Sequence, residues 1–451
     1  MISSLQESIY SDEIFSQLPS NIIELIARYA DISVGKLRLS RNMAYGLFDT
    51  YVRTGIFDMS KIEVQNFVPE VKEKIHNLTD VLSFYQLYGY TNLTHLKFGM
   101  KFNQPVYKMP PNLTPLTFGW LKSQPVNKLL PQNLTHLTFG RNFNQSIDGL
   151  LPPNLTHLIF GENFNQPIDG LLPQNLTHLT FGWMFNRSVD NLPPNLTHLT
   201  FKSHYFNQSI NRLPPNLTHL ILGNDFNQQV DNLPQNLTHL TFGWVFNQSV
   251  NSLPPNLTHL TFSNNFNKTV DGALPPNLTH LTFGYNFNKS VDNLPHSLTH
   301  LKFGLFFNES VDNLPHSLTH LTFGYNFNES VNRLPPNLTH LTFGYSFNES
   351  VNRLPPNLTH LTFGKNFNKP VDNLPHSLTH LTFGYNFNQP IHSLSPNLIH
   401  LTLGHNFNQP IHSLPSNLMH LTLNYTFNNL LIDNNILINN LLPNLKILYQ
   451  N

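Results

Sequence analysis

Length, composition and charge exclude several classes of protein. The chain has 451 residues, with 25 Lys and Arg against 25 Asp and Glu, 24 His, 34 Pro and no Cys. A formal charge of zero offers no basic footprint to a polyanion, so we expect no nucleic-acid partner. Without Cys there are no disulfides, thiolate metal ligands or Cys nucleophiles, which suits a reducing compartment.

Neither a signal peptide nor a membrane span is expected. Polar side chains interrupt the first ten residues, and no stretch approaches the roughly 20 apolar residues that cross a bilayer. We therefore expect a cytoplasmic protein without a membrane partner.

The composition changes near residue 90. Residues 1–80 hold 8 Lys and Arg and 11 Asp and Glu, whereas only 4 Asn precede Thr91 and 58 follow from Asn92 onward. Two kinds of structure are therefore joined. We predict a helical domain at 1–60, a linker and N-terminal cap at 61–91, a repeat solenoid at 92–429 and a C-terminal cap at 430–451.

The second part repeats the motif Asn-Leu-Thr-His-Leu-Thr-Phe-Gly-x-x-Phe-Asn. It occurs seventeen times, in steps of 20 or 21 residues, and such a fixed period is the signature of a solenoid. The first Leu of the motif falls at residues 93, 113, 134, 155, 176, 196, 217, 237, 257, 278, 298, 318, 338, 358, 378, 398 and 418.

The first half of each repeat predicts a short strand. In the repeat that starts at Leu338, the Leu-x-x-Leu-x-Phe spacing matches the strand of leucine-rich repeats, with Leu341 and Phe343 also facing inward. Alternation then places His340 on the outer face. Gly344 is expected to end the strand with a positive φ.

The second half predicts a return segment without helix. Phe347 and Val351 supply two more inward anchors, and Pro355 and Pro356 bar a helix interior. We expect a gently curved, slim and mainly β solenoid, a leucine-rich-repeat-like parallel sheet of about seventeen 20–21-residue coils from about Leu93 to Leu423. Leu442-Pro443-Asn444-Leu445 would form a last, degenerate coil.

Two polar columns recur at fixed places. An Asn such as Asn348 follows the second Phe in sixteen of seventeen repeats, and we expect its side chain to satisfy backbone groups of adjoining coils. A His occupies one column in sixteen repeats, with Pro115 the exception. It predicts either a stacked aromatic ladder or a broad recognition surface. Close stacking would disfavour simultaneous protonation and lower the imidazole pKa.

No chemistry is expected from these columns. A metal site needs three or four convergent ligands, whereas a straight ladder supplies neighbours along one line only. No Ser-His-Asp set, phosphate loop or unique carboxylate pair breaks the repetition. The sequence therefore predicts no catalytic residue, no cofactor and no metal.

The residue after Phe-Gly varies although its neighbours do not. Packing does not dictate this position, so it is free to define a partner, and Tyr and Trp are common interface anchors. A solvated turn with an aromatic lid is the alternative. The candidates for binding an unknown target protein are Trp120, Trp183, Trp244, Tyr285, Tyr325, Tyr345 and Tyr385.

Two family resemblances follow from these residues. Residues 14–26, with Leu18-Pro19 followed by the paired aliphatics Ile22-Ile23, resemble the opening of an F-box. The repeats resemble FNIP repeats, as in Phe164-Asn165-Gln166-Pro167-Ile168. Proteins that pair the two resemble those of social amoebae and of giant viruses that infect amoebae, in which case the compartment would be the host cytoplasm.

The resemblance implies a substrate receptor of a cullin-RING ubiquitin ligase. The F-box would dock the adaptor subunit through Leu18, Pro19, Ile22, Ile23 and Ile26, and the solenoid would present a target. The alternative is a binding scaffold whose N-terminal helices only cap the first coil. A third possibility, a carbohydrate-acting solenoid enzyme, needs an acidic cluster that the sequence lacks.

Overall fold

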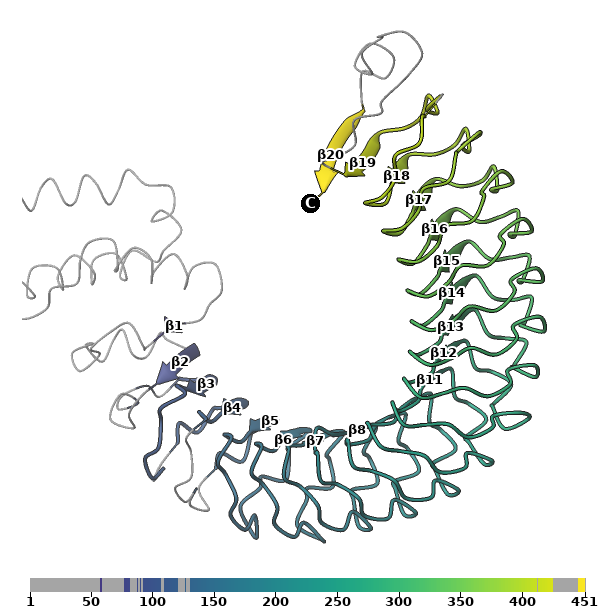
Figure 1. Cartoon of the computed structure of the whole chain (residues 1–451). Coiled ribbons are helices and arrows are strands. Elements are labelled where there is room, and N and C mark those ends of the chain that lie inside the picture. Colours follow the sequence, from purple (N-terminus) through teal and green to yellow (C-terminus); the bar gives the residue numbers. More distant parts are fainter. Residues whose placement is uncertain are drawn as a thin grey trace, which may run out of the picture. The chain divides into compact units, whose positions relative to one another are not determined.

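The computed structural model (Figure 1) describes residues 57–58, 77–81, 87, 90, 92–106, 109–120, 126, 130–411, 413–424 and 445–450. They fall into two compact units. The first runs to Leu196 and includes Phe201–Ser203, and the second has Thr197–Thr200 and the chain from His204 onward. Each unit is a stack of coils in which a short strand alternates with a longer return segment.

One strand opens each coil. The first unit holds β1 (Phe57–Asp58), β2 (Asn77–Val81), β3 (His95–Phe98), β4 (Pro115–Thr117), β5 (His136–Thr138), β6 (His157–Ile159) and β7 (His178–Phe181). The second begins with β8 (His198–Phe201) and continues with β9 (His219–Ile221), β10 (His239–Thr241), β11 (His259–Thr261), β12 (His280–Thr282), β13 (His300–Lys302), β14 (His320–Thr322), β15 (His340–Thr342), β16 (His360–Thr362), β17 (His380–Thr382), β18 (His400–Thr402), β19 (His420–Asn424) and β20 (Lys446–Gln450).

The strands pair in parallel and in the same register. Between β14 and β15, His320 lies opposite His340 and Leu321 opposite Leu341. The predicted parallel solenoid is thereby confirmed, and identical residues stand side by side in successive coils. In the second unit, β11 to β19 lie on the concave side (Figure 1).

The sheet of the first unit starts earlier than Leu93, where the sequence predicts it. β2 pairs with β3 and aligns Leu78 with Leu96, and β1 pairs with β2. Leu78 takes the place of the second Leu of the motif and Asn77 that of the His, so the Asn-Leu-Thr at 77–79 is not in register with the Asn-Leu-Thr of the repeats. Without the His and the Phe-Gly, the sequence does not reveal this coil.

A predicted last coil follows at the other end. β20 begins directly after Leu445 and pairs in parallel with β19, with Lys446 opposite His420 and Ile447 opposite Leu421. Leu448 and Tyr449 of this strand are exposed. Most of the predicted C-terminal cap lies outside the described residues.

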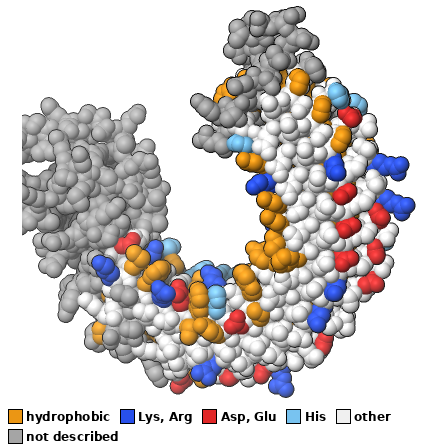
Figure 2. All heavy atoms as spheres, in the orientation of Figure 1, with side chains coloured by type: hydrophobic (Ala, Val, Ile, Leu, Met, Phe, Trp, Pro, Cys, Tyr) orange, Lys and Arg blue, Asp and Glu red, His pale blue; other side chains and the backbone are white. Residues whose placement is uncertain are grey.

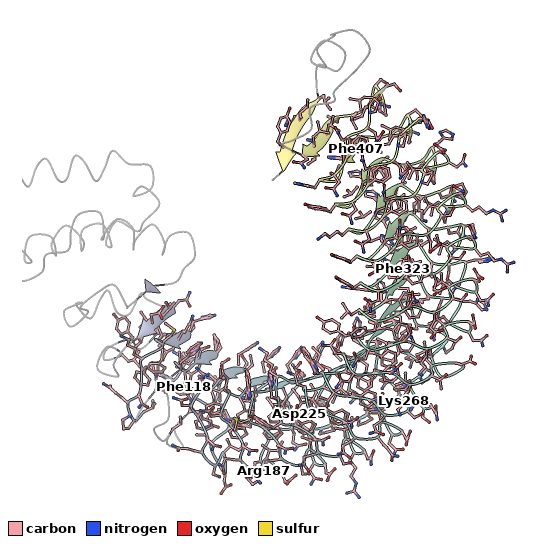
Figure 3. All side chains as sticks on the ribbon, viewed as in Figure 1. Phe118, Arg187, Asp225, Lys268, Phe323 and Phe407 are labelled. Atoms are coloured by element: carbon pink, nitrogen blue, oxygen red, sulfur yellow. The ribbon has the colours of Figure 1, made fainter. Side chains whose placement is uncertain are left out.

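The core consists of buried ladders of Leu, Phe and Val or Ile. Leu338, Leu341, Phe343, Phe347 and Val351 are all buried, which confirms the predicted inward anchors. The rings of Phe343 and Phe347 stack with centroids 3.8 Å apart. Figure 3 shows Phe323 of the same column, stacked 5.5 Å from Phe343 in the next coil. Burial of these rings is the main source of stability.

The return segments are turns and extended chain. Among the described residues none of them contains an α-helix. The carbonyl of Pro355 accepts the N–H of Leu358 at 3.3 Å, which closes a turn just before the strand. Proline thus ends the return segment as its geometry predicts.

Some coils hold one residue more. In the coil of β8 the extra residue lies between Phe201 and Phe206, after the strand, and in three other coils the return turn absorbs it. Gly149, Gly170 and Gly272 lie in such coils and have φ values of 60°, 71° and 65°. In the last of them the N–H of Ala273 donates to the Val270 carbonyl at 3.1 Å. The strands keep their register across this coil, because His259 still lies opposite His280.

The reason for Gly344 is different from the one that the sequence suggested. Its φ is not positive. Instead, a Cβ at this position would collide with the carbonyl oxygen of Gly324 in the preceding coil. The coils approach so closely after the strand that the turn has almost no room for a side chain. At Ser263, the hydroxyl fills the column and donates to the buried carbonyl of Phe246.

The Asn column has the structural role that we expected. The backbone N–H of Asn348 donates to Oδ1 of Asn328 at 2.7 Å, and that of Asn368 donates to Oδ1 of Asn348 at 2.9 Å. The Asn that precedes the first Leu acts similarly, since Nδ2 of Asn337 donates to the His316 carbonyl at 2.8 Å. Side chains thus continue the hydrogen bonding between coils beyond the strands.

Truncation of a ring in the core should cost far more than truncation of an exposed one. Phe347→Ala removes a fully buried ring, and we expect it to lower the free energy of unfolding by about 3–5 kcal/mol. Phe306→Ala removes a ring that is 48% exposed, so its effect should stay within about 0.5 kcal/mol. Urea unfolding of both variants tests this, and equal costs would contradict the assigned core.

Candidate binding surface on the strand side

Histidine and threonine side chains form the outer face of the sheet. In the second unit, we call the twelve His from His198 to His420 that open β8 to β19 the histidine column. Thr342 and its equivalents form the threonine column beside it. Both columns are partly exposed, and the Leu between them is buried.

The imidazole rings stack as a ladder. The centroids of His320 and His340 are 4.2 Å apart, and those of His340 and His360 are also 4.2 Å apart. In the first unit, His157 stacks on His136 and on His178 at 4.1 Å. The predicted aromatic ladder is therefore present in both units.

A threonine holds each ring in place. The hydroxyl of Thr339 donates to the Thr319 carbonyl at 3.1 Å and lies 2.9 Å from Nδ1 of His340. Because the hydroxyl has one hydrogen, we assign the proton of the neutral ring to Nδ1. Nε2 of His340 then has no hydrogen-bond partner among the described residues and is an acceptor. Ile399 and Met419 replace this Thr before His400 and His420.

The ladder favours neutral imidazoles. The pKa of His340 is lowered to about 4, first because burial disfavours the charged ring and then because His360 and His320 lie beside it. Burial and neighbouring His lower the pKa of His219 and His300 in the same way. The expected repulsion between rings is confirmed as a cause, but burial is the larger one.

A second column lies where the chain leaves each strand. We give the name rim column to the first residue after Phe-Gly or Leu-Gly in the coils from Asn224 to His405. Tyr325 and Tyr345 stack with centroids 4.3 Å apart. The Nζ atom of Lys365 lies 5.2 Å from the Tyr345 ring and 5.0 Å from the Tyr385 ring, and Tyr385 stacks on His405 at 4.5 Å.

The structure thus brings five of the predicted candidates into two groups. Five successive coils supply the continuous stack of Tyr325, Tyr345, Lys365, Tyr385 and His405. Figure 2 shows hydrophobic side chains along the inner edge of the second unit.

Trp244 and Tyr285 form a separate pair, edge to face at 6.2 Å. Sequence reasoning chose the aromatic residues and left Lys365 and His405 aside, although both stand at the same place in the motif.

The two remaining candidates belong to the first unit. Trp120 and Trp183 are exposed. The guanidinium of Arg141 lies 5.4 Å from the Trp120 ring and forms a 2.7 Å ion pair with Glu162. These two Trp occupy the same place in the motif, and the coils that begin at Leu134 and Leu155 lie between them in the sequence.

The candidate adaptor-binding residues Leu18, Pro19, Ile22, Ile23 and Ile26 lie outside the described residues.

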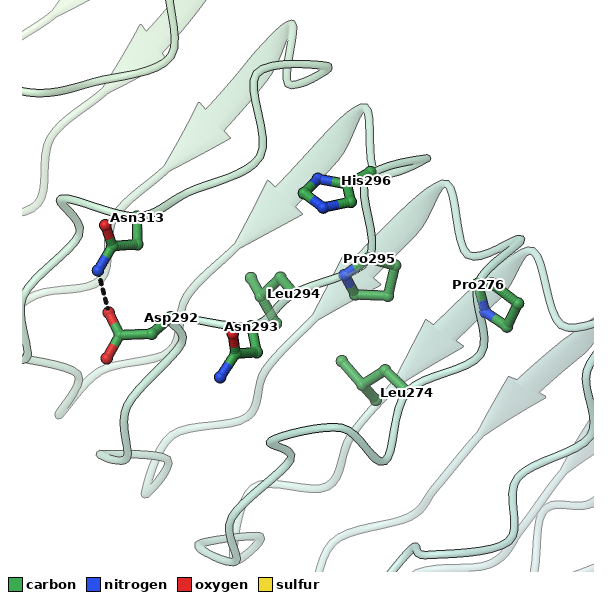
Figure 4. A pocket seen from close by; sticks show the side chains of 8 residues that line it. All are labelled: Leu274, Pro276, Asp292, Asn293, Leu294, Pro295, His296 and Asn313. Atoms are coloured by element: carbon green, nitrogen blue, oxygen red, sulfur yellow. Dashed lines mark hydrogen bonds between the residues drawn. The ribbon is translucent and has the colours of Figure 1, made fainter.

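A shallow pocket of about 370 Å³ lies on the return side (Figure 4). It is lined by Leu274, Pro276, Asp292, Asn293, Leu294, Pro295, His296 and Asn313. Asp292 accepts hydrogen bonds from Asn313 at 3.0 Å and from Ser290 at 2.8 Å, and both lower its pKa. Its carboxylate therefore already has partners within the coils.

The described residues contain neither a metal-binding cluster nor a membrane-spanning helix. No group of three or more His, Asp or Glu could hold a metal ion there. No helix in this part of the chain has the length and apolar character needed to cross a membrane.

The coils and their exposed strand side define a leucine-rich-repeat-like solenoid. Comparison with known proteins identifies the repeat family to which the chain belongs. The FNIP Repeat family model matches ten overlapping or adjoining segments between residues 123 and 426. This protein belongs to the FNIP repeat family. Comparison with curated protein sequences gave no match.

Two solved structures are similar. CroV588, a giant-virus protein described as a novel circular LRR protein structure, is 42% identical with a TM-score of 0.65. The match covers 83% of this chain and 65% of CroV588, so this chain spans less than two thirds of that protein. YopM from Yersinia enterocolitica is 21% identical with a TM-score of 0.52, over 89% of this chain and 90% of YopM, and shares the fold.

Stability should fall as the pH drops from about 6.5 toward 4. Below the ordinary imidazole pKa near 6.5 the unfolded chain takes up protons, whereas folded His340 resists until about pH 4. The unfolded state then binds more protons, so acid favours it.

Urea midpoints at pH 7.5 and pH 5 test this. A His320→Gln, His340→Gln, His360→Gln variant should lose less stability in acid than the parent protein. Equal midpoints at both pH values would contradict the depressed pKa of the ladder.

Proposed function

We propose that this protein is a non-enzymatic binding solenoid that holds another protein against the strand side of its second unit. One observation carries the proposal: all fifteen large hydrophobic side chains that are exposed among the described residues lie in a strand or within four residues of one. Return segments expose none of this kind in the described part of the chain. Exposed apolar groups that gather on one face mark interaction sites.

The rim column is the proposed centre of this surface. Tyr and Trp supply large contact areas at low entropic cost and are enriched among residues that dominate binding energy. Tyr325 and Tyr385 are each 44% exposed, and stacking against Tyr345 and Lys365 holds them in place. A preorganised row of this kind loses little side-chain freedom on binding.

Loss of the rim tyrosines should abolish partner capture. The full-length protein is used to isolate a partner from an amoebal extract, and the identified partner is then titrated in purified form. Tyr325→Ala, Tyr345→Ala and Tyr385→Ala together should weaken binding by about 100-fold or more, since each anchor contributes about 1–3 kcal/mol. Arg333→Ala with Arg353→Ala, on the return side, is the matched control and should leave the affinity unchanged.

We further propose that the protein is a substrate receptor of a cullin-RING ubiquitin ligase. The support is the F-box-like order of Leu18, Pro19, Ile22 and Ile23 ahead of a solenoid that has its own core. The chain would then act by proximity, because holding a target near a charged ubiquitin carrier raises its effective concentration. The alternative, a scaffold with an N-terminal cap, predicts different behaviour of the same residues.

One variant distinguishes the ligase proposal from the scaffold with an N-terminal cap. If Ile22 and Ile23 contact the adaptor, Ile22→Ala with Ile23→Ala should weaken adaptor capture about 30-fold and leave solenoid unfolding unchanged. If they are core residues of a cap, the same change should cost about 2–5 kcal/mol of stability per Ile. A pull-down of the adaptor beside a urea melt decides between them. If the variant loses its fold and the parent protein does not capture the adaptor, the ligase proposal is wrong.

A further inference from the structure

Charge is distributed unevenly between the two sides of the second unit. We give the name strand-side strip to a set of neighbouring positions in the second unit. It comprises the histidine column, the threonine column, the rim column, the residue after the rim column and the matching positions of β20. Of nine Asp and Glu described in the second unit, only Asp225 lies in this strip. The remaining eight follow the Asn ladder or the Val anchor, outside the strand. Figure 2 shows the acidic side chains away from the inner edge.

Three lysines lie in the strip. Lys302 takes a threonine-column position in β13 and is exposed, Lys365 belongs to the rim column, and Lys446 lies opposite His420. The strip therefore combines a small positive charge with exposed aromatic rings. Surfaces of this kind favour partners of opposite charge, because complementary potentials select the partner and steer its approach.

The histidine column adds a charge that depends on its ligand. Where a Thr holds Nδ1, as at His340, the neutral ring presents Nε2 as an acceptor, and an acceptor repels a carboxylate. A bound carboxylate beside Nε2 would stabilise the protonated ring, which could then donate to it. The other charged or titratable groups of the strip are Lys302, Lys446, Asp225, the rim residues Lys365 and His405, and the rim tyrosines. The opposite side of the sheet is a layer of buried Leu and Phe.

We propose that the strand-side strip of the second unit docks an acidic, extended polypeptide segment, and that the histidine column takes up protons when this segment binds. The inference rests on the protein-binding function proposed above and adds the chemistry of the partner. An extended segment fits because the columns run as straight lines over successive coils. Apolar side chains of the segment would contact the tyrosines, and its carboxylates would lie near Lys302, Lys365 and the imidazoles.

A polyphosphate backbone fits this strip less well than a polypeptide. The strip has three lysines distributed over several coils, no arginine and one carboxylate. Nucleic-acid sites carry a denser basic charge, because each nucleotide brings a phosphate. A few carboxylates between apolar side chains match the observed mixture of charge and aromatic surface.

The test measures binding of a defined acidic polypeptide. A fluorescein-labelled random copolymer of Glu and Tyr is titrated with the full-length protein, and its anisotropy is followed at low salt. The parent protein should bind it at least about threefold more tightly at pH 6.0 than at pH 7.5, because binding takes up protons. His320→Gln, His340→Gln and His360→Gln together should reduce this pH dependence.

Charge reversal locates the site. Lys302→Glu with Lys365→Glu should weaken binding about tenfold or more. Lys268→Glu with Lys289→Glu makes the same change of charge at exposed residues that follow the Asn ladder, and it should change affinity less than about twofold. Figure 3 labels Lys268. Melting curves confirm that both variants are folded.

Several results would overturn the inference. Equal binding of a Lys and Tyr copolymer would exclude selection for acidic chains, and equally tight binding of single-stranded DNA would indicate a general polyanion surface. Weaker binding at pH 6.0, or equal losses in the two charge-reversal variants, would also contradict it. If the copolymer does not bind while the rim tyrosines still control capture of the isolated partner, the acidic-partner inference fails and the binding function stands.

Discussion

Each coil bonds to the next in one register, and this constraint shapes the rest of the protein. His320 lies opposite His340, and the N–H groups of Thr339 and His340 both donate to the Thr319 carbonyl. Backbone pairing at this spacing leaves each position of the motif facing its own copy. Every residue choice is therefore repeated as a column, and a side chain must be compatible with itself at close range.

This requirement explains which residues fill the columns. Phe343 and Phe347 meet their copies as stacked rings, which is a favourable arrangement for aromatic side chains. Asn348 meets its copy as donor and acceptor, because an amide oxygen can accept the next backbone N–H. Imidazole satisfies the same rule only while it is neutral. Carboxylates in successive coils repel one another, and among the described residues they follow one another only outside the strand, as at Glu309, Glu329 and Glu349.

Much of the fold could be predicted from sequence, because its signals recur. Leu338, Leu341, Phe343 and Val351 are buried as their spacing indicates, and prolines before the strand end each return segment. Prediction failed where one residue served a different purpose from the usual one. Gly344 is small to admit the neighbouring carbonyl rather than to reach a positive φ, and only the distance between coils reveals it.

The candidate surface was predicted less completely. Choosing aromatic residues after Phe-Gly found Tyr325, Tyr345 and Tyr385, but the stack also needs Lys365 and His405. A list based on residue type misses them, whereas a list based on place in the motif includes them. The coil at Leu78 escaped because its strand keeps the second Leu of the motif but has Asn77 in place of the His and lacks the Phe-Gly.

The extra residue beside Gly272 has a consequence for how such a chain can change over time. The return turn takes up an insertion and the strands on either side keep their partners. Insertions are thus accepted in the return turn and, between Phe201 and Phe206, directly after a strand, while the strands themselves stay in register. Duplication or loss of a whole coil by recombination would keep every ladder in register and change only its length. The reach of the surface can therefore evolve by copying units, without any redesign of the coil itself.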